Sequence, residues 1–181
     1  MDHDLHLPSS GVVTTAAVVL HPHPAMGGDR HHPLVVTVSE GLAAIGVAAL
    51  RLDLRDPDVA ASGAALEHLA VDLTREVGTD RLVLVGYSWG SVVAATAAPP
   101  GLTARVLVAP PVGMFDLPVP DVATLVLVPA HDQYGSPDAV HEAMDAHASS
   151  TIEIVESCDH FLAGAVGRIA ARAVTWVSAQ L

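Results

Sequence analysis

The sequence predicts an α/β fold: a three-layer α/β/α sandwich around a mostly parallel sheet of about six to seven strands. Short apolar, β-branched runs alternate with amphipathic helical patterns along the whole chain. The runs are apolar throughout, as expected for parallel strands that helices cover on both faces. Because the chain has 181 residues, we expect residues 1–181 to form a single domain.

Six apolar runs predict the strands, and the patterns between them predict five helices. The strands are expected at Ala17–Leu20, Val47–Leu54, Arg81–Gly86, Arg105–Ala109, Ala123–Val128 and Thr151–Val155. The helices are expected at His32–Ile45, Ala64–Val77, Ser91–Ala98, Ser136–His147 and Ala165–Leu181. Pro33 and Pro137 suit first helical positions, and Gly46 and Gly78 suit the ends of two helices.

Composition and charge exclude several classes of partner. Hydrophobic residues make up 51% of the chain but aromatic residues only 3%, so Ala, Val and Leu must fill the core. The net charge is −12, and every basic residue other than histidine is arginine. Such a surface repels nucleic acid and anionic membranes, so we expect neither as a partner. The absence of lysine also excludes Schiff-base and Ser–Lys chemistry.

The amino-terminal residues and the single cysteine suggest a cytoplasmic protein. The acidic start Met1–Asp4 lacks the basic residues of a secretory signal. The run Gly11–Leu20 is too short to span a bilayer, which takes about 20 apolar residues. Cys158 has no partner for a disulfide within the chain, and a small buried role suits it best. Whether the protein is a monomer or a homodimer stays open.

The strongest local signal is Gly86-Tyr87-Ser88-Trp89-Gly90, which follows a predicted strand and opens a predicted helix. This is the nucleophile-elbow pattern in the context that it requires. Glycines on either side let the chain reverse sharply and leave the serine exposed above the sheet. The start of the following helix favours the negative charge of an oxyanion. We therefore expect Ser88 to be a nucleophile.

A serine nucleophile needs a base and an acid that orients the base, in the chain order Ser, Asp/Glu, His. Asp132 and His160 satisfy this order, and each follows a predicted strand. Asp53, at the end of an earlier strand, is the backup acid. Asp159 is expected to be a turn residue, because it cannot easily orient the ring of its neighbour.

The oxyanion hole needs two backbone N–H groups that point to one place. Trp89, after the nucleophile, should provide one of them. The loop 21–29 should provide the other, and since Pro22 and Pro24 lack an N–H, the donor is His23, Ala25 or Met26. We favour Ala25.

Histidines are frequent around this loop, which raises the question of a metal site. The candidates are His21, His23, His31 and His32. Imidazole is a good zinc ligand, but no matching cysteines and no HExxH helix accompany these residues. The prolines instead suit an extended, shaped loop, and we expect no metal and no cofactor.

Five motifs, in order, resemble those of small, lid-less α/β-hydrolases of the dienelactone-hydrolase-like family. They are His21-Pro22-His23-Pro24 with Gly27-Gly28, Gly86–Ser91, Val108–Val112, His131-Asp132 through Val140, and Asp159-His160-Phe161. The resemblance implies a triad of Ser88, Asp132 and His160, with the oxyanion hole at Trp89 and the 23–26 stretch. It also implies a shallow, open site, and leading antiparallel strands that are shortened or absent. True dienelactone hydrolases carry cysteine at the position of Ser88, so the resemblance favours esterase-like activity.

We therefore expect a serine hydrolase that cleaves a small carboxylic ester or thioester. His23, Met26, Tyr134 and Phe115 are the candidate substrate-binding residues, and core packing is an equally good interpretation of Phe115 and Tyr134. The negative charge favours a neutral or cationic substrate, unless Arg30 or Arg55 offsets it. The alternatives are acyl transfer to a specialised metabolite by the same triad, and a non-catalytic binding protein on a hydrolase fold.

Overall fold

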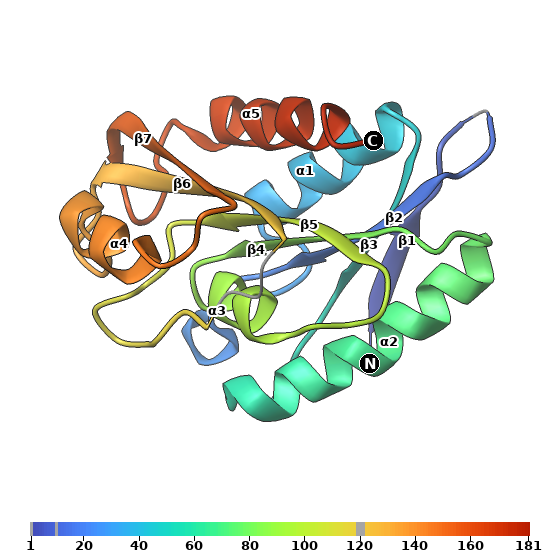
Figure 1. Ribbon diagram of the computed structural model, residues 1–181, viewed down its shortest axis with the longest axis horizontal. Coiled ribbons are helices and arrows are strands. Elements are labelled where there is room, and N and C mark those ends of the chain that lie inside the picture. The colour runs from blue at the N-terminus through green and yellow to red at the C-terminus, as the bar shows by residue number, and fades with distance from the viewer. Residues whose placement is uncertain (1, 10, 119–121) are drawn as a thin grey trace.

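A seven-stranded sheet forms the centre of the molecule in the computed structural model, which describes residues 2–9, 11–118 and 122–181 (Figure 1). The strands are β1 (His3–His6), β2 (Thr15–Leu20), β3 (Val47–Leu52), β4 (Leu82–Tyr87), β5 (Leu102–Val108), β6 (Ala123–His131) and β7 (Ser150–Asp159). Their order in the sheet is β1-β3-β2-β4-β5-β6-β7. Only β1, among the described strands, pairs antiparallel. The predicted fold class is confirmed.

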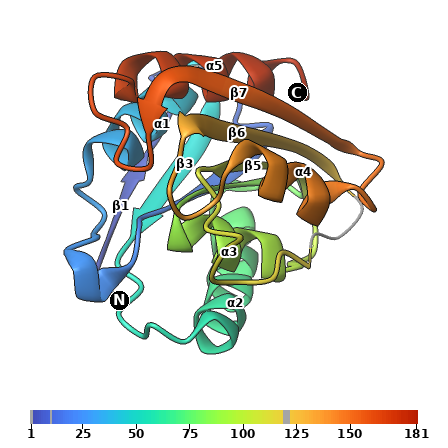
Figure 2. The same cartoon turned by 90° about the vertical axis from the view of Figure 1, so that its left-hand side faces the viewer.

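Helices cover both faces of the sheet, as Figure 2 shows with the sheet between two helical layers. The helices α1 (Pro33–Ala44) and α5 (Val166–Ser178) pack on one face. The helices α2 (Val59–Val77), α3 (Trp89–Thr96) and α4 (Pro137–Met144) pack on the other. A short 3₁₀ helix, η1 (Pro24–Met26), lies between β2 and α1.

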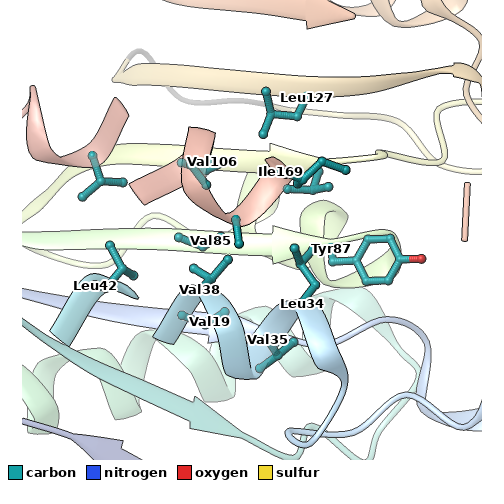
Figure 3. Packing of buried hydrophobic residues seen from close by; sticks show 14 of the residues in the cluster. Val19, Leu34, Val35, Val38, Leu42, Val85, Tyr87, Val106, Leu127 and Ile169 are labelled. Atoms are coloured by element: carbon teal, nitrogen blue, oxygen red, sulfur yellow. The ribbon is translucent and has the colours of Figure 1, made fainter. Parts of the chain in front are cut away.

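Successive strand residues point to opposite faces, so each strand contributes to two apolar clusters. On the α1–α5 face, Val19, Val85 and Val106 from three strands meet Val38 of α1 and Ile169 of α5 (Figure 3). Burying a side chain of this size stabilises the fold by about 1.5–3 kcal/mol. Because both faces are buried in this way, the parallel strands are continuously apolar, which is the pattern that the sequence shows.

The structure differs from the prediction mainly at the ends of elements. Strand β1 was not predicted, because its four residues are mostly polar and only Leu5 packs against the core. Helix α2 begins at Val59 rather than Ala64, since the Asp58 side chain caps it by accepting from the Ala61 N–H at 2.7 Å. Strands β6 and β7 continue to His131 and Asp159, which pair with each other and place the following loops side by side.

Candidate active site

Ser88 lies at the sharp turn between β4 and α3. Its backbone has φ 53° and ψ −122°, a strained conformation for a residue other than glycine. The Ser88 N–H donates to the Val108 carbonyl on the neighbouring strand at 2.9 Å, and its own carbonyl accepts from the Ser91 N–H at 2.9 Å. Backbone hydrogen bonds on both sides therefore hold the strained residue.

The two glycines of the turn are there because no larger residue fits. A Cβ atom on Gly86 would lie 2.2 Å from the Gly90 carbonyl oxygen. A Cβ atom on Gly90 would lie 2.4 Å from the carbonyl oxygen of His21, at the end of β2. The backbone at Gly86 thus lies directly against the backbone at Gly90, and Gly90 lies directly against the backbone at His21.

An unbroken chain of hydrogen bonds runs from Ser88 to Asp132. The Ser88 Oγ lies 2.8 Å from His160 Nε2. On the other side of the ring, His160 Nδ1 lies 2.8 Å from Oδ2 and 3.0 Å from Oδ1 of Asp132. Because a carboxylate only accepts, Nδ1 must carry the proton, and the lone pair of Nε2 faces the serine hydroxyl.

Asp132 is held rigidly and shielded from water. Its side chain is 0% exposed, against 7% for His160. Its Oδ1 accepts from the N–H groups of Tyr134 at 2.8 Å and Gly135 at 3.1 Å, in the turn before α4. These bonds fix the carboxylate in the orientation that His160 requires.

The two other aspartates that the sequence raised have different partners. Asp53 accepts from the Arg30 N–H at 2.8 Å and is paired with the Arg30 guanidinium. Burial alone would raise the pKa of Asp53, but the Arg30 contacts outweigh burial and lower it. Asp159 accepts from the Phe161 N–H at 3.1 Å, as expected of a turn residue.

Loop 21–29 packs against the elbow, but the N–H that we favoured there is occupied. The Ala25 N–H donates to His23 Nδ1 at 3.2 Å, and the Met26 N–H donates to the His23 carbonyl at 3.0 Å. The His23 N–H has no acceptor among the described residues, nor has that of Trp89 at the start of α3. The His23 and Trp89 rings are in contact, with centroids 5.6 Å apart. Of the three candidate donors in this loop, His23 is thus the one whose N–H has no acceptor within the described residues.

The rings of His21 and His32 bind backbone groups. His21 Nε2 accepts from the Leu54 N–H at 2.9 Å, and Nδ1 lies 2.6 Å from the Pro22 carbonyl oxygen. His32 Nδ1 accepts from the Leu34 N–H at 3.3 Å and caps α1. Burial lowers the pKa of both histidines. Within residues 2–9, 11–118 and 122–181, no three His, Cys, Asp or Glu side chains gather in a way that could hold a metal ion.

The predicted substrate-binding residues lie at different depths. Tyr134 contacts the His160 ring edge-on, with centroids 4.7 Å apart. Met26 is 74% exposed on η1. Phe115 packs against the core cluster beneath α2, α3 and α4. Its aromatic side chain therefore serves the core at least in part, which was the alternative interpretation of this residue.

Two motif residues, Tyr87 and Phe161, contact His160 although the sequence analysis gave them no role at the site. Tyr87 lies between the predicted nucleophile and its glycine, and its hydroxyl donates to the His160 carbonyl at 2.8 Å. Phe161 follows the histidine directly, and its exposed ring lies 5.8 Å from that of His160. Each of them is adjacent in sequence to a predicted site residue, which was the available signal. Such a neighbour contacts the site only where the local backbone conformation allows it.

Solved structures of several hydrolases are similar to this chain. An α/β serine hydrolase without lid from Xanthomonas campestris is 23% identical, with a TM-score of 0.83 over 96% of this chain and 86% of that one. The dienelactone hydrolase of Anabaena variabilis is 21% identical, with a TM-score of 0.81 over 99% and 91%. An esterase domain from Rhodothermus marinus is 16% identical, with a TM-score of 0.75 over 96% and 90%.

Comparisons by sequence add nothing to this likeness. No protein-family profile matches the chain, and no curated protein matches it. Across the part of the chain that the structure describes, no helix is both long and apolar enough to cross a membrane. At these identities the similarity shows the fold alone. The sheet order, the elbow after β4 and these neighbours together show that the chain has the α/β-hydrolase fold.

Proposed function

We propose that this protein is a serine hydrolase that cleaves a small carboxylic ester or thioester through an acyl-enzyme on Ser88. The observation that carries the proposal is the continuous hydrogen-bond chain from Asp132 through His160 to Ser88. A serine hydroxyl needs such a base to become nucleophilic, and the base needs an orienting acid.

In the proposed mechanism, His160 Nε2 removes the proton of the Ser88 hydroxyl while Oγ forms a bond to the acyl carbon. The carbonyl oxygen becomes an oxyanion, and Asp132 stabilises the imidazolium. His160 then gives the proton to the leaving oxygen or sulfur as that bond breaks. Water repeats the two steps on the acyl-enzyme, which releases the acid and restores the Ser88 hydroxyl.

The oxyanion would be held by the N–H groups of Trp89 and His23. Both groups lack an acceptor within the described residues, and the side chains of the two residues are in contact. Trp89 also opens α3, where the helix dipole favours negative charge. The ring of His23 fixes its own loop by accepting from the Ala25 N–H, so the donor is oriented before the substrate arrives.

Labelling with a fluorophosphonate probe, together with hydrolysis of p-nitrophenyl acetate, tests this proposal. The wild type should be labelled and should release p-nitrophenol, and Ser88→Ala should do neither. Circular dichroism and thermal unfolding of both proteins should confirm that the variant is folded. If folded wild type neither takes the label nor cleaves the ester, the proposed function is wrong.

A further inference from the structure

Every arginine in this protein already has a partner, which bears on the charge of the substrate. Five of the eight arginines form ion pairs with carboxylates. These pairs are Arg30 with Asp4 and Asp53, Arg51 with Asp4, Arg55 with Asp2, Arg75 with Asp72, and Arg172 with Glu153. The remaining three donate to backbone carbonyls: Arg81 to Gln180, Arg105 to Ala94 and Ala97, and Arg168 to Glu156 and Ser157.

Arg30 and Arg55 were the two cations that could have offset the negative charge near the site. Arg30 uses its guanidinium on both Asp53 and Asp4, and only 22% of its side chain is exposed. Arg55 pairs with Asp2 at 2.5 Å. Since the chain has no lysine, a substrate carboxylate that binds a guanidinium would have to take it from a partner that it already has.

The surface beside the catalytic histidine is aromatic. Phe161 is 56% exposed, and its ring contacts the rings of both His160 and Tyr134 edge-on. Met26 and Met114 are exposed in the loops after β2 and β5, which lie on either side of β4 in the sheet. The carboxyl ends of parallel strands meet at one edge, so the loops that carry these two methionines flank the loop that carries Ser88.

We infer that the substrate of this hydrolase is an uncharged ester or thioester whose apolar part lies against Phe161 and Tyr134. The inference rests on the proposed function and narrows its substrate class. An apolar group gains by covering an exposed aromatic ring. A carboxylate in the same place loses water without gaining a cation, and the net charge of −12 repels it from a distance.

Two p-nitrophenyl esters of equal carbon number test the inference: the hexanoate, which is neutral, and the mono-adipate, which ends in a carboxylate. We expect kcat/KM for the adipate to be at least about 10-fold lower than for the hexanoate. Part of this difference should disappear in high salt, because salt screens the long-range repulsion. Equal kcat/KM values for the two esters would overturn the inference.

Variants at Phe161 make the test specific to this surface. Phe161→Ala should lower kcat/KM for the hexanoate by about 5-fold or more through lost apolar contact. Phe161→Arg should raise kcat/KM for the adipate relative to the hexanoate, because it supplies an unpaired cation. Leu7→Ala removes another exposed hydrophobic side chain, beyond β1, and should leave both values unchanged.

The outcomes separate this inference from the proposed function. Labelling of Ser88 with rapid hydrolysis of both esters, or no response to Phe161→Ala and Phe161→Arg, would overturn the substrate class and leave the serine hydrolase intact. If Ser88 is not labelled and neither ester is hydrolysed, both the inferred substrate class and the proposed function are wrong. A preference for the hexanoate that Phe161→Arg narrows or reverses would support both.

Discussion

Asp53 and Asp132 occupy equivalent places in the two halves of the sheet. Each follows a parallel strand, β3 or β6, and each is at the edge where the loops of the site lie. Asp132 faces the ring of His160, and its carboxylate is closed off from water. Asp53 faces Arg30 and ties the loop before α1 to the end of β3. The same residue type in the same kind of place thus binds a histidine ring in one case and anchors a loop in the other.

The difference lies in what the topology places opposite each carboxylate. Strand β7 pairs with β6 as far as His131 and Asp159, which puts His160 beside Asp132. Strand β3 lies between β1 and β2, so Asp53 meets the loop that follows β2 and pairs with the guanidinium of Arg30 in that loop. The position of an acid after a strand therefore does not by itself decide its partner, because the neighbouring loop supplies that partner.

The largest expected effect comes from exchanging each carboxylate for an amide. Asp132→Asn should lower kcat by about 10³–10⁴-fold, because the amide would favour the wrong tautomer of His160. Asp53→Asn should lower kcat by less than about 10-fold, since it weakens only the anchoring of the loop. Steady-state kinetics on p-nitrophenyl acetate measure both. A more severe loss in Asp53→Asn than in Asp132→Asn would reverse the assignment of the two acids.

The contact between the elbow at Ser88 and the loop that follows β2 can be broken at Gly90. Gly90→Ala would press a methyl group on the His21 carbonyl oxygen, and should lower the free energy of unfolding by about 2–3 kcal/mol. Gly167→Ala is the matched control. Gly167 is likewise the second residue of its helix, and a Cβ atom there would meet nothing within 4 Å. Urea unfolding should show a change of less than about 1 kcal/mol for the control. Equal effects would mean that the elbow and the loop are not in tight contact.

A substitution at Tyr87 tests how firmly the loop that contains His160 is held to β4. Tyr87→Phe removes only the hydroxyl that donates to the His160 carbonyl, and should cost about 1–2 kcal/mol because a buried acceptor loses its partner. Tyr134→Phe should cost less than about 0.5 kcal/mol, since the Tyr134 hydroxyl donates to no described residue. Thermal or urea unfolding compares the two variants. A Tyr134 effect as large as that of Tyr87 would show that this hydrogen bond is not what holds the histidine loop.

The smallest expected effect is a pH dependence of the protein's stability that arises at His21 and His32, between β2 and α1. Burial lowers the pKa of His21 below its usual value of 6.5, so the unfolded chain binds a proton there more readily than the folded one. Stability should therefore decrease as the pH falls through about 6.5, and level off below the folded pKa. Burial gives His32 the same sign.

Melting temperatures between about pH 7.5 and 5.5 measure this dependence. In His21→Asn the decrease should be smaller than in the wild type, because one of the titrating groups is gone. His32→Asn should act in the same direction and provides the test if the first variant is unstable. A decrease of the wild-type size in both variants would place its origin elsewhere.

The sequence by itself predicted most of the framework and brought together Ser88, Asp132 and His160, which the structure joins by hydrogen bonds. The parallel strands are continuously apolar because both faces are buried, so their positions could be read directly. The elbow could be read for a similar reason: its strain and its close backbone contacts are local, and they leave the pattern of Gly86, Ser88 and Gly90 in the sequence. Strand ends, the start of α2 and β1 were less visible, since a side-chain cap or a partner strand sets them.

Only the tertiary structure decided which of the possible partners meet. Which of Asp132 and Asp53 meets His160 depends on the pairing of β6 with β7. Which of the Ala25 and His23 N–H groups lacks an acceptor depends on the ring of His23, which accepts the Ala25 N–H. Several arginines likewise have partners from elements far apart in the chain, as Arg30 and Asp4 do. Local backbone demands leave a pattern in the sequence. Contacts between distant side chains leave none, because many residues of the same type could have made them.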